Sequence, residues 1–104
     1  LMLLGLGDDG HTASLFPGSH SLSVVEKWAT TSTGKGHDRI TLTAPVLSAS
    51  SKVIFLVSGK AKQIALRRLL DPKETSTRTP AKLVQPDHQI LVLTDQAASE
   101  LLSN

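Results

Sequence analysis

Three short runs of mainly apolar residues constrain the fold of this chain more than any other feature. They lie at residues 1–6, 52–57 and 90–93. Short apolar runs that are bounded by glycine or other turn residues are typical of strands buried inside a sheet. A helical pattern ending near residue 70 follows the second run, and another helical pattern follows the third. Strands that alternate with helices predict an α/β domain with a mostly parallel sheet and helices on its faces.

Both helical patterns have recognisable boundaries. Asp71-Pro72 stops the first, because proline cannot continue a helix. Its inward face is expected to consist of four apolar residues, Ala61, Ile64, Ala65 and Leu69. Thr94 or Asp95 is expected to cap the last helix. Its inward residues are expected to be Ala97, Ala98, Leu101 and Leu102.

The remaining segments are shorter or more polar. Residues 39–43 alternate polar and apolar side chains, which predicts a half-buried strand. Pro45 fits the first turn of a short helix over 46–50. Residues 11–16 allow only a short helical turn, because the Pro-Gly pair that follows breaks the helix. Two polar segments are predicted to be mostly loop, 19–38 and 71–80.

Size and composition exclude several classes of function. The 104 residues are one domain or part of one. The chain has no cysteine, so it has neither a disulfide framework nor a thiolate metal site. A net charge of +2, two phenylalanines and one tryptophan argue against a nucleic-acid partner. No apolar run approaches the roughly 20 residues of a membrane span, and no signal peptide is visible, so we expect a cytoplasmic protein.

The segment 4–18, LGLGDDGHTASLFPG, carries the main candidate chemistry. A glycine-rich turn that displays Asp9 and His11 follows a predicted strand, and ligands of open α/β sheets bind at this edge. Histidine can move protons near neutral pH, and a carboxylate two residues earlier can fix its tautomer. The simpler interpretation is a polar loop residue. No spacing of His and Asp predicts a metal site, and His20, His37 and His88 are expected to be solvated.

The same turn, GLGDDG, also matches the dinucleotide fingerprint G-x-G-x-x-G. Glu26 lies near the spacing expected of a ribose-binding acid. Two features disfavour this alternative. The helix that should follow is cut short, and Asp8 and Asp9 would place negative charge where a pyrophosphate should bind.

A second candidate is the turn 58–62, SGKAK, where a strand passes into a helix. Backbone N–H groups at such a point favour an anion, and a lysine in the first turn adds positive charge. Solvated lysines on an exposed turn are an equally good interpretation. Arg39 begins a strand and faces either solvent or a ligand, whereas Arg67-Arg68 is expected to be a solvated helix face.

Several segments together resemble the glucosamine-6-phosphate isomerase/6-phosphogluconolactonase family. The resemblance begins with GLGDDGHTASLFPG and continues through four further blocks, RITLTAPVLSAS, VIFLVSGKAKQIALRRLL, PAKLVQPD and ILVLTDQAASELL. It spans the chain except for 19–38 and 71–79. Only the C-terminal portion of the family's single domain is matched, so we expect residues 1–104 to be an incomplete domain of a longer parent. The implied fold is a three-layer α/β/α architecture.

The resemblance also implies roles for individual residues. His11 matches the family's proposed general base, and Asp9 would support it. Lys62 and Arg39 match residues implied to contact the substrate phosphate. Gly7 and Gly10 belong to the substrate-binding turn, whose N–H groups are candidates to stabilise an oxyanion. The segment TGKGHD before Arg39 departs from the family's proline-rich approach.

The expected activity is hydrolysis of 6-phospho-D-glucono-1,5-lactone to 6-phosphogluconate, without a metal or other cofactor. Loss of activity in the isolated chain is compatible with this expectation, because the family's upstream phosphate loop is not in it. A deaminase-like isomerase is an alternative, but the Asn-Glu-Pro block of that relative is replaced here by Ser-Leu-Phe-Pro. A non-catalytic sugar-phosphate-binding module is another. Apart from the sugar-phosphate lactone, the expected partner is a second copy, through an open sheet edge.

Overall fold

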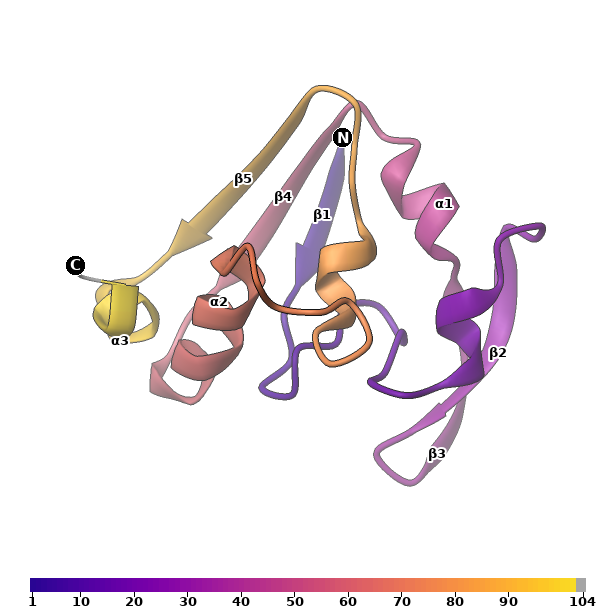
Figure 1. The fold of residues 1–104 in the computed structure, drawn as a ribbon, viewed down its shortest axis with the longest axis horizontal. Coiled ribbons are helices and arrows are strands. Elements are labelled where there is room, and N and C mark those ends of the chain that lie inside the picture. Colours follow the sequence, from indigo (N-terminus) through magenta and orange to yellow (C-terminus); the bar gives the residue numbers. More distant parts are fainter. Residues whose placement is uncertain (103–104) are drawn as a thin grey trace.

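The computed structural model describes residues 1–102 and places the three apolar runs in one parallel sheet (Figure 1). The strands are β1 (Met2–Gly5), β4 (Lys52–Val57) and β5 (Gln89–Thr94), in the order β1-β4-β5. Met2 pairs with Val53 and Ile90 lies opposite Val53 on the other side, so the three strands are in register. The predicted α/β fold with a parallel sheet is confirmed.

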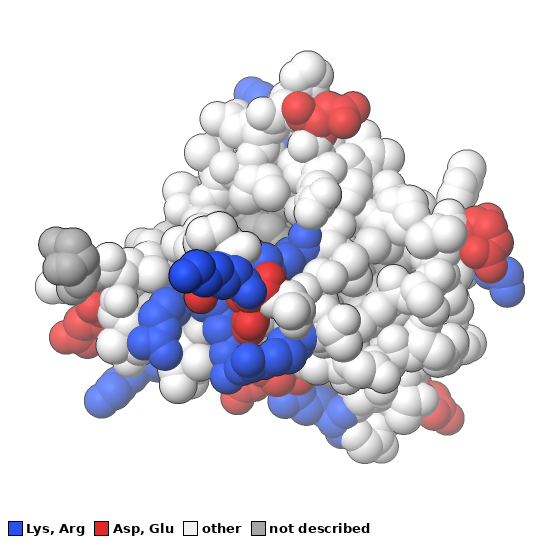
Figure 2. Space-filling model, in the orientation of Figure 1, with Lys and Arg blue, Asp and Glu red and all other residues white. Residues whose placement is uncertain are grey.

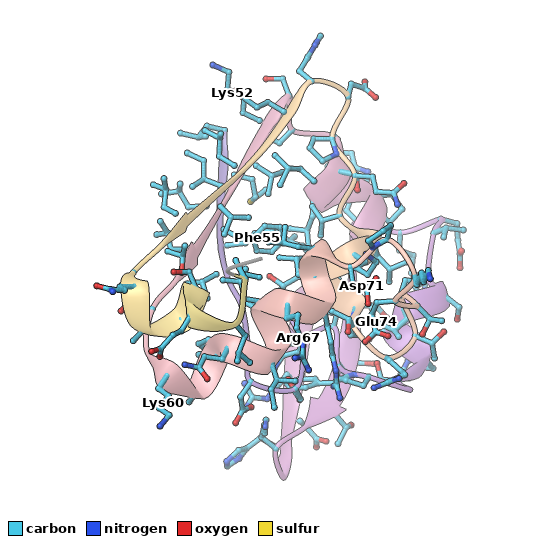
Figure 3. The ribbon with its side chains drawn as sticks, turned by 60° about the vertical axis from the view of Figure 1, so that its left-hand side comes forward. Lys52, Phe55, Lys60, Arg67, Asp71 and Glu74 are labelled. Atoms are coloured by element: carbon cyan, nitrogen blue, oxygen red, sulfur yellow. The ribbon has the colours of Figure 1, made fainter. Side chains whose placement is uncertain are left out.

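The core lies on one face of this sheet. Val53, Phe55 and Val57 of β4 are buried and point towards α2 (Gln63–Leu70), whose Ala65 and Leu66 are also buried. Figure 3 shows the Phe55 ring between β4 and α2. Figure 1 shows α2 and the 3₁₀ helix η3 (Pro80–Leu83) on the same side of the sheet. Apolar burial on this face is the main stabilising contribution to the fold.

The opposite face of the sheet is exposed. Its side chains alternate with those of the core and include Leu3, Leu56, Leu91 and Leu93, which are 40 to 57% exposed. The prediction of buried strands is therefore right only for the core-facing side chains of the first and second runs, and it is wrong for the third run, because none of residues 90–93 is buried. Among the described residues, helices cover one face only. The sheet and the helices on this face form two of the three layers that the resemblance implies.

The inward face of α2 differs from the predicted one. Ala65 is buried and Leu69 packs against the core, as predicted. Ala61 and Ile64 are exposed, whereas Leu66 is fully buried. The reason is local: a 3₁₀ helix, η2 (Lys60–Lys62), precedes α2 and has about 3.0 residues per turn. The tighter turn changes the phase of the helix, so a period of 3.6 counted from Ala61 does not hold across η2.

The other two α-helices are short. Pro45 lies in the first turn of α1 (Ala44–Ser48), as predicted. The Asp95 carboxylate accepts a hydrogen bond from the Ala98 N–H at 2.8 Å and caps α3 (Gln96–Ser99), which η4 (Glu100–Leu102) continues. Of the four predicted inward residues only Ala98 is buried, and Leu101 and Leu102 are 42% and 37% exposed.

A β-hairpin occupies much of the segment that was predicted to be loop. After a 3₁₀ helix, η1 (His20–Ser23), β2 (Ala29–Gly34) pairs antiparallel with β3 (His37–Leu42). The connecting residues Lys35 and Gly36 have φ of 53° and 78°, as the favoured two-residue hairpin turns require. The strand at 39–43 is thus confirmed, but the loop prediction for 29–38 is wrong.

The hairpin buries polar side chains and exposes apolar ones. Ser32 and Thr41 are buried, whereas Ile40 is 79% exposed. The buried hydroxyls bind the loop after β1: Ser32 donates to the Ser14 carbonyl at 2.6 Å, and Thr41 accepts from the Ser14 N–H at 3.1 Å. The hairpin therefore docks through hydrogen bonds, and it does so beside the candidate site.

Candidate active site

The candidate site is the loop that follows β1 at the carboxyl edge of the sheet. The Gly7 N–H donates to the His11 carbonyl at 2.8 Å, and the Gly10 N–H donates to the Gly7 carbonyl at 2.9 Å. These bonds close a compact loop that displays Asp8, Asp9 and His11. They also use the two glycine N–H groups, so these donors shape the loop and are not available to an oxyanion.

Asp9 and His11 form a close pair. The Asp9 carboxylate oxygen Oδ1 lies 2.5 Å from His11 Nδ1 and also accepts the His11 backbone N–H at 3.0 Å. The carboxylate only accepts, so the neutral ring carries its proton on Nδ1 and leaves Nε2 free as a base. The sequence predicted this pairing correctly, and the structure supplies its geometry.

Opposing effects act on the Asp9 carboxyl. Partial burial by itself raises its pKa, since burial disfavours the charged form. The hydrogen bonds from the His11 ring and N–H, together with the charges of His11 and Lys35, outweigh burial and lower the pKa below its usual value. Asp9 therefore stays ionised and can stabilise a protonated His11.

Gly7 is required because the pair approaches the backbone closely. A Cβ atom at this position would lie 2.0 Å from His11 Nδ1 and 2.8 Å from Asp9 Oδ1. No side chain fits there. Gly7 is thus required by the packing of the pair, in addition to its hydrogen bond to the His11 carbonyl.

The segment after the pair is a turn and not the expected helical turn. Thr12 donates its hydroxyl to the Gly5 carbonyl at 2.7 Å, and the Leu15 N–H bonds to the Thr12 carbonyl at 3.0 Å. Ala13 has a φ of 50°, in the left-handed region. The bonds of Ser14 to the hairpin hold this conformation, so tertiary contacts override the local helical tendency.

Phe16 links His11 to the hairpin. Its ring centroid lies 4.5 Å from that of His11, and the Arg39 guanidinium carbon lies 5.4 Å from the centre of the Phe16 ring. Arg39 Nε also donates to the Gly34 carbonyl at 3.1 Å. The structure thus connects Arg39 to His11 through Phe16. Arg39 also lines a hollow of about 650 Å³ that is formed by hairpin residues alone.

Lys35 is a neighbour of the pair that sequence reasoning missed. Its ammonium lies 3.5 Å from Asp8 Oδ1 and 3.6 Å from Asp9 Oδ2. Lys35-Gly36, which lies between a Thr/Ser-rich run and the alternating segment 39–43, was the available signal for a hairpin turn, and that turn places Lys35 here.

Lys62 lies after β4, at the same edge of the sheet as the loop after β1. Among residues 1–102, no hydrogen bond or ion pair joins it to Asp9, His11 or Arg39. The predicted anion site at this turn is partly filled by the protein itself, because the Gly59 N–H donates to the Asp95 carboxylate at 3.0 and 3.2 Å. This hydrogen bond connects the turn to Asp95, the residue that caps α3.

The predicted solvated residues have mixed outcomes. His20, His37 and His88 are exposed, as expected. Arg68 is not simply solvated, since its Nε lies 3.6 Å from the Glu74 carboxylate. Glu74, Thr79 and Pro80 are largely buried, so the loop prediction for 71–80 is right about its backbone and wrong about these side chains.

The dinucleotide alternative does not fit the structure. The loop after β1 returns to its own start through the Gly7–His11 bond, and no helix begins at Gly10 to bind a pyrophosphate. Glu26 is exposed. Within the described chain, no group of three or more metal-ligating side chains is assembled, and no helix has the length and hydropathy to cross a membrane.

A parallel sheet with a carboxylate–histidine loop at its carboxyl edge defines an α/β domain of the ligand-binding type. Residues 1–93 match the family described as glucosamine-6-phosphate isomerases/6-phosphogluconolactonase. The chain is 43% identical over 102 residues to 6-phosphogluconolactonase of Synechocystis sp.. It therefore belongs to this family. The match covers 98% of this chain and 42% of that relative, so the chain spans less than half the length of the relative.

Solved structures agree with this assignment. The 6-phosphogluconolactonase of Leishmania guyanensis superposes with a TM-score of 0.83 at 29% identity, covering 98% of this chain and 41% of that one. A monomeric glucosamine-6-phosphate deaminase superposes with a TM-score of 0.66 at 26% identity, covering 93% and 46%. The fold is thus shared by both branches of the family.

Proposed function

We propose that this chain carries the general-base portion of a 6-phosphogluconolactonase site, which hydrolyses 6-phospho-D-glucono-1,5-lactone to 6-phosphogluconate. The observation that carries the proposal is the Asp9–His11 pair, with its 2.5 Å contact at Nδ1. We also propose that residues 1–104 are the C-terminal portion of such a domain. The likeness to lactonases over nearly the whole chain supports both proposals.

The reaction needs only a base, a water molecule and a bound lactone. His11 Nε2 takes a proton from water, whose oxygen attacks the lactone carbonyl to give a tetrahedral oxyanion. The oxyanion collapses, the bond from the carbonyl carbon to the ring oxygen breaks, and protonated His11 returns the proton to that oxygen. Ionised Asp9 stabilises the imidazolium between these steps.

The phosphate is proposed to bind away from the reacting carbon and so to orient the ring. Arg39 is the better supported contact, because it is held over Phe16 on the His11 side. Lys62 is the second, through its place after β4 at the same sheet edge. A cytoplasmic location stays a prediction.

Two alternative functions can be distinguished from lactone hydrolysis. A deaminase-like isomerase shares the fold, but the position of its Asn-Glu-Pro block is Ser14-Leu15-Phe16-Pro17 here, so the carboxylate is absent from this segment. A sugar-phosphate-binding module would bind the product without turnover. The lactonase interpretation is favoured because Asp9 holds His11 in the tautomer that a base requires.

The test compares His11→Asn with His20→Asn, an exposed histidine outside the loop. Lactone hydrolysis is measured with correction for spontaneous opening, and 6-phosphogluconate binding is measured by calorimetry. Hydrolysis that is lost in His11→Asn and kept in His20→Asn supports the proposal. Full turnover in His11→Asn contradicts the role of His11, and binding without turnover in the unmodified protein favours the binding module.

A further inference from the structure

The loop 71–79 packs against the loop that carries the Asp9–His11 pair. Its centre is Glu74, whose side chain is only 8% exposed although it carries a charge. Figure 3 shows Glu74 just beyond the end of α2, and Figure 2 shows basic side chains around acidic ones in this region. A largely buried carboxylate needs partners to offset its desolvation. The partners of Glu74 show which residues this loop holds in place.

Both oxygens of the Glu74 carboxylate are bound. Oε2 accepts the Thr79 hydroxyl at 2.8 Å and lies 3.6 Å from Arg68 Nε. Oε1 accepts the Thr75 N–H at 3.3 Å and lies 3.8 Å from an Arg78 nitrogen. The shortest of these contacts fixes the rotamer of Thr79, which is itself fully buried.

Thr79 packs directly against Gly10, in the loop that carries the Asp9–His11 pair. Gly10 has a φ of 90°, and a Cβ atom there would lie 3.1 Å from both Cα and Cγ2 of Thr79. Two residues further on, the Ala81 N–H donates to the Gly10 carbonyl at 3.1 Å. The backbone of Gly10 is therefore held from both its Cα and its carbonyl side.

From Gly10 the connection to the pair consists of backbone hydrogen bonds. The Gly10 N–H binds the Gly7 carbonyl, and the Gly7 N–H binds the His11 carbonyl. A displacement of Gly10 would move both ends of this loop, and with them the contact between Asp9 and His11. Small displacements of a catalytic group can cost about a hundredfold in rate.

We propose that Thr79, fixed by Glu74, is a positioning residue for the Asp9–His11 pair. It touches neither partner and acts through Gly10. The effect on catalysis rests on the proposed lactonase function, but the effect on the loop does not. A purely structural role in closing the loop 71–79 is the competing explanation.

The test uses three variants. Thr79→Val removes the hydroxyl and keeps the shape, and Thr79→Ser keeps the hydroxyl. Thr43→Val is the matched control, because Thr43 is also fully buried and donates its hydroxyl to the Lys27 carbonyl at 2.6 Å, in another part of the molecule. The measurements are amide hydrogen exchange at Gly7 and Gly10, the ¹⁵N shifts of the His11 ring, and thermal unfolding.

We expect Thr79→Val to accelerate exchange at Gly7 and Gly10 by about tenfold relative to amides of β4, and to shift the His11 ring signals. Thr79→Ser is expected to restore both. Thr43→Val is expected to lower the unfolding temperature by a similar amount and to leave these signals unchanged. Unchanged Gly10 and His11 signals in folded Thr79→Val overturn the proposal.

If Thr79→Val does not fold, Glu74→Ala, which removes the acceptor of the Thr79 hydroxyl, replaces it, with the same two outcomes. Exchange and ring shifts do not depend on turnover, so they test positioning even if the chain hydrolyses no lactone. Where hydrolysis is measurable, kcat is expected to fall about tenfold in Thr79→Val with little change in KM. Failure of turnover in the unmodified protein concerns the proposed function alone.

Discussion

Two turns leave neighbouring parallel strands at the same edge of the sheet, yet they differ in what their polar groups do. The turn after β1 binds its own backbone and brings Asp9 and His11 together at 2.5 Å. The turn after β4 donates its Gly59 N–H to Asp95, which follows β5. The first turn thus holds the Asp9–His11 pair by its own hydrogen bonds, whereas the second turn binds a carboxylate that follows β5 and so connects β4 to α3. Two turns at the same sheet edge can therefore have different structural roles.

The largest expected effect comes from the glycines of the two turns. Gly7→Ala should destabilise the protein by about 3 kcal/mol, because the new Cβ would overlap the His11 ring. Gly59→Ala should cost about 1 to 2 kcal/mol, because Gly59 has a φ of 98° but open space around it. Urea unfolding of both variants measures the difference. Equal losses would show that the His11 contact does not limit the first turn.

The next effect concerns Asp95, which binds both the Gly59 and the Ala98 N–H groups. Asp95→Ala should destabilise by about 1 to 2 kcal/mol, as for loss of a helix cap. Asp87→Ala, at an exposed acid, is the matched control and should have almost no effect. If the two variants unfold at the same urea concentration, the turn after β4 does not depend on Asp95.

The smallest expected effect is the pH dependence of the first turn. The pKa of Asp9 is lowered in the folded state, so its ionised form adds stability at pH values above its unfolded pKa, near 3.8. That contribution is lost as the pH falls through the folded pKa. Because the side chain is 32% exposed, we expect less than about 1 kcal/mol.

The measurement is the difference in unfolding free energy between the unmodified protein and Asp9→Asn, followed by urea titration from pH 5 down to acid. The difference should shrink as the pH falls below the unfolded pKa of Asp9. A difference that grows on acidification would contradict the assigned direction of the pKa shift.

Much of the fold could be predicted because it follows from short-range patterns. Continuous apolar residues in 52–57 predicted β4, and Asp95 was one of two candidates for a cap. The alternation rule detected the second strand of the hairpin but missed β2, because the buried side chains of the hairpin are hydroxyls, Ser32 and Thr41, and its apolar Ile40 is exposed. A rule that places apolar side chains inward cannot recognise the docking face of a hairpin that docks through hydrogen bonds.

In the candidate site, too, contacts between residues close in sequence could be predicted and contacts between distant residues could not. Asp9 and His11 lie two residues apart, so their pairing could be predicted from spacing. Lys35 and Thr79 could not, because each comes from a distant loop and reaches the site only after the chain has folded. At the turn 58–62 the local pattern could not show that the Asp95 carboxylate, which is distant in sequence, binds the Gly59 N–H.

The sequence by itself determined the parallel strands, the family and the Asp9–His11 unit, because apolar runs and near-neighbour spacing are encoded locally. Only the tertiary structure decided which face of the sheet is covered and that the Gly7 and Gly10 N–H groups donate within their own loop. It also decided that Thr79, whose hydroxyl binds Glu74, packs against Gly10 in the loop of the site. These features depend on contacts between residues far apart in the chain, whose burial and hydrogen bonding no local pattern specifies.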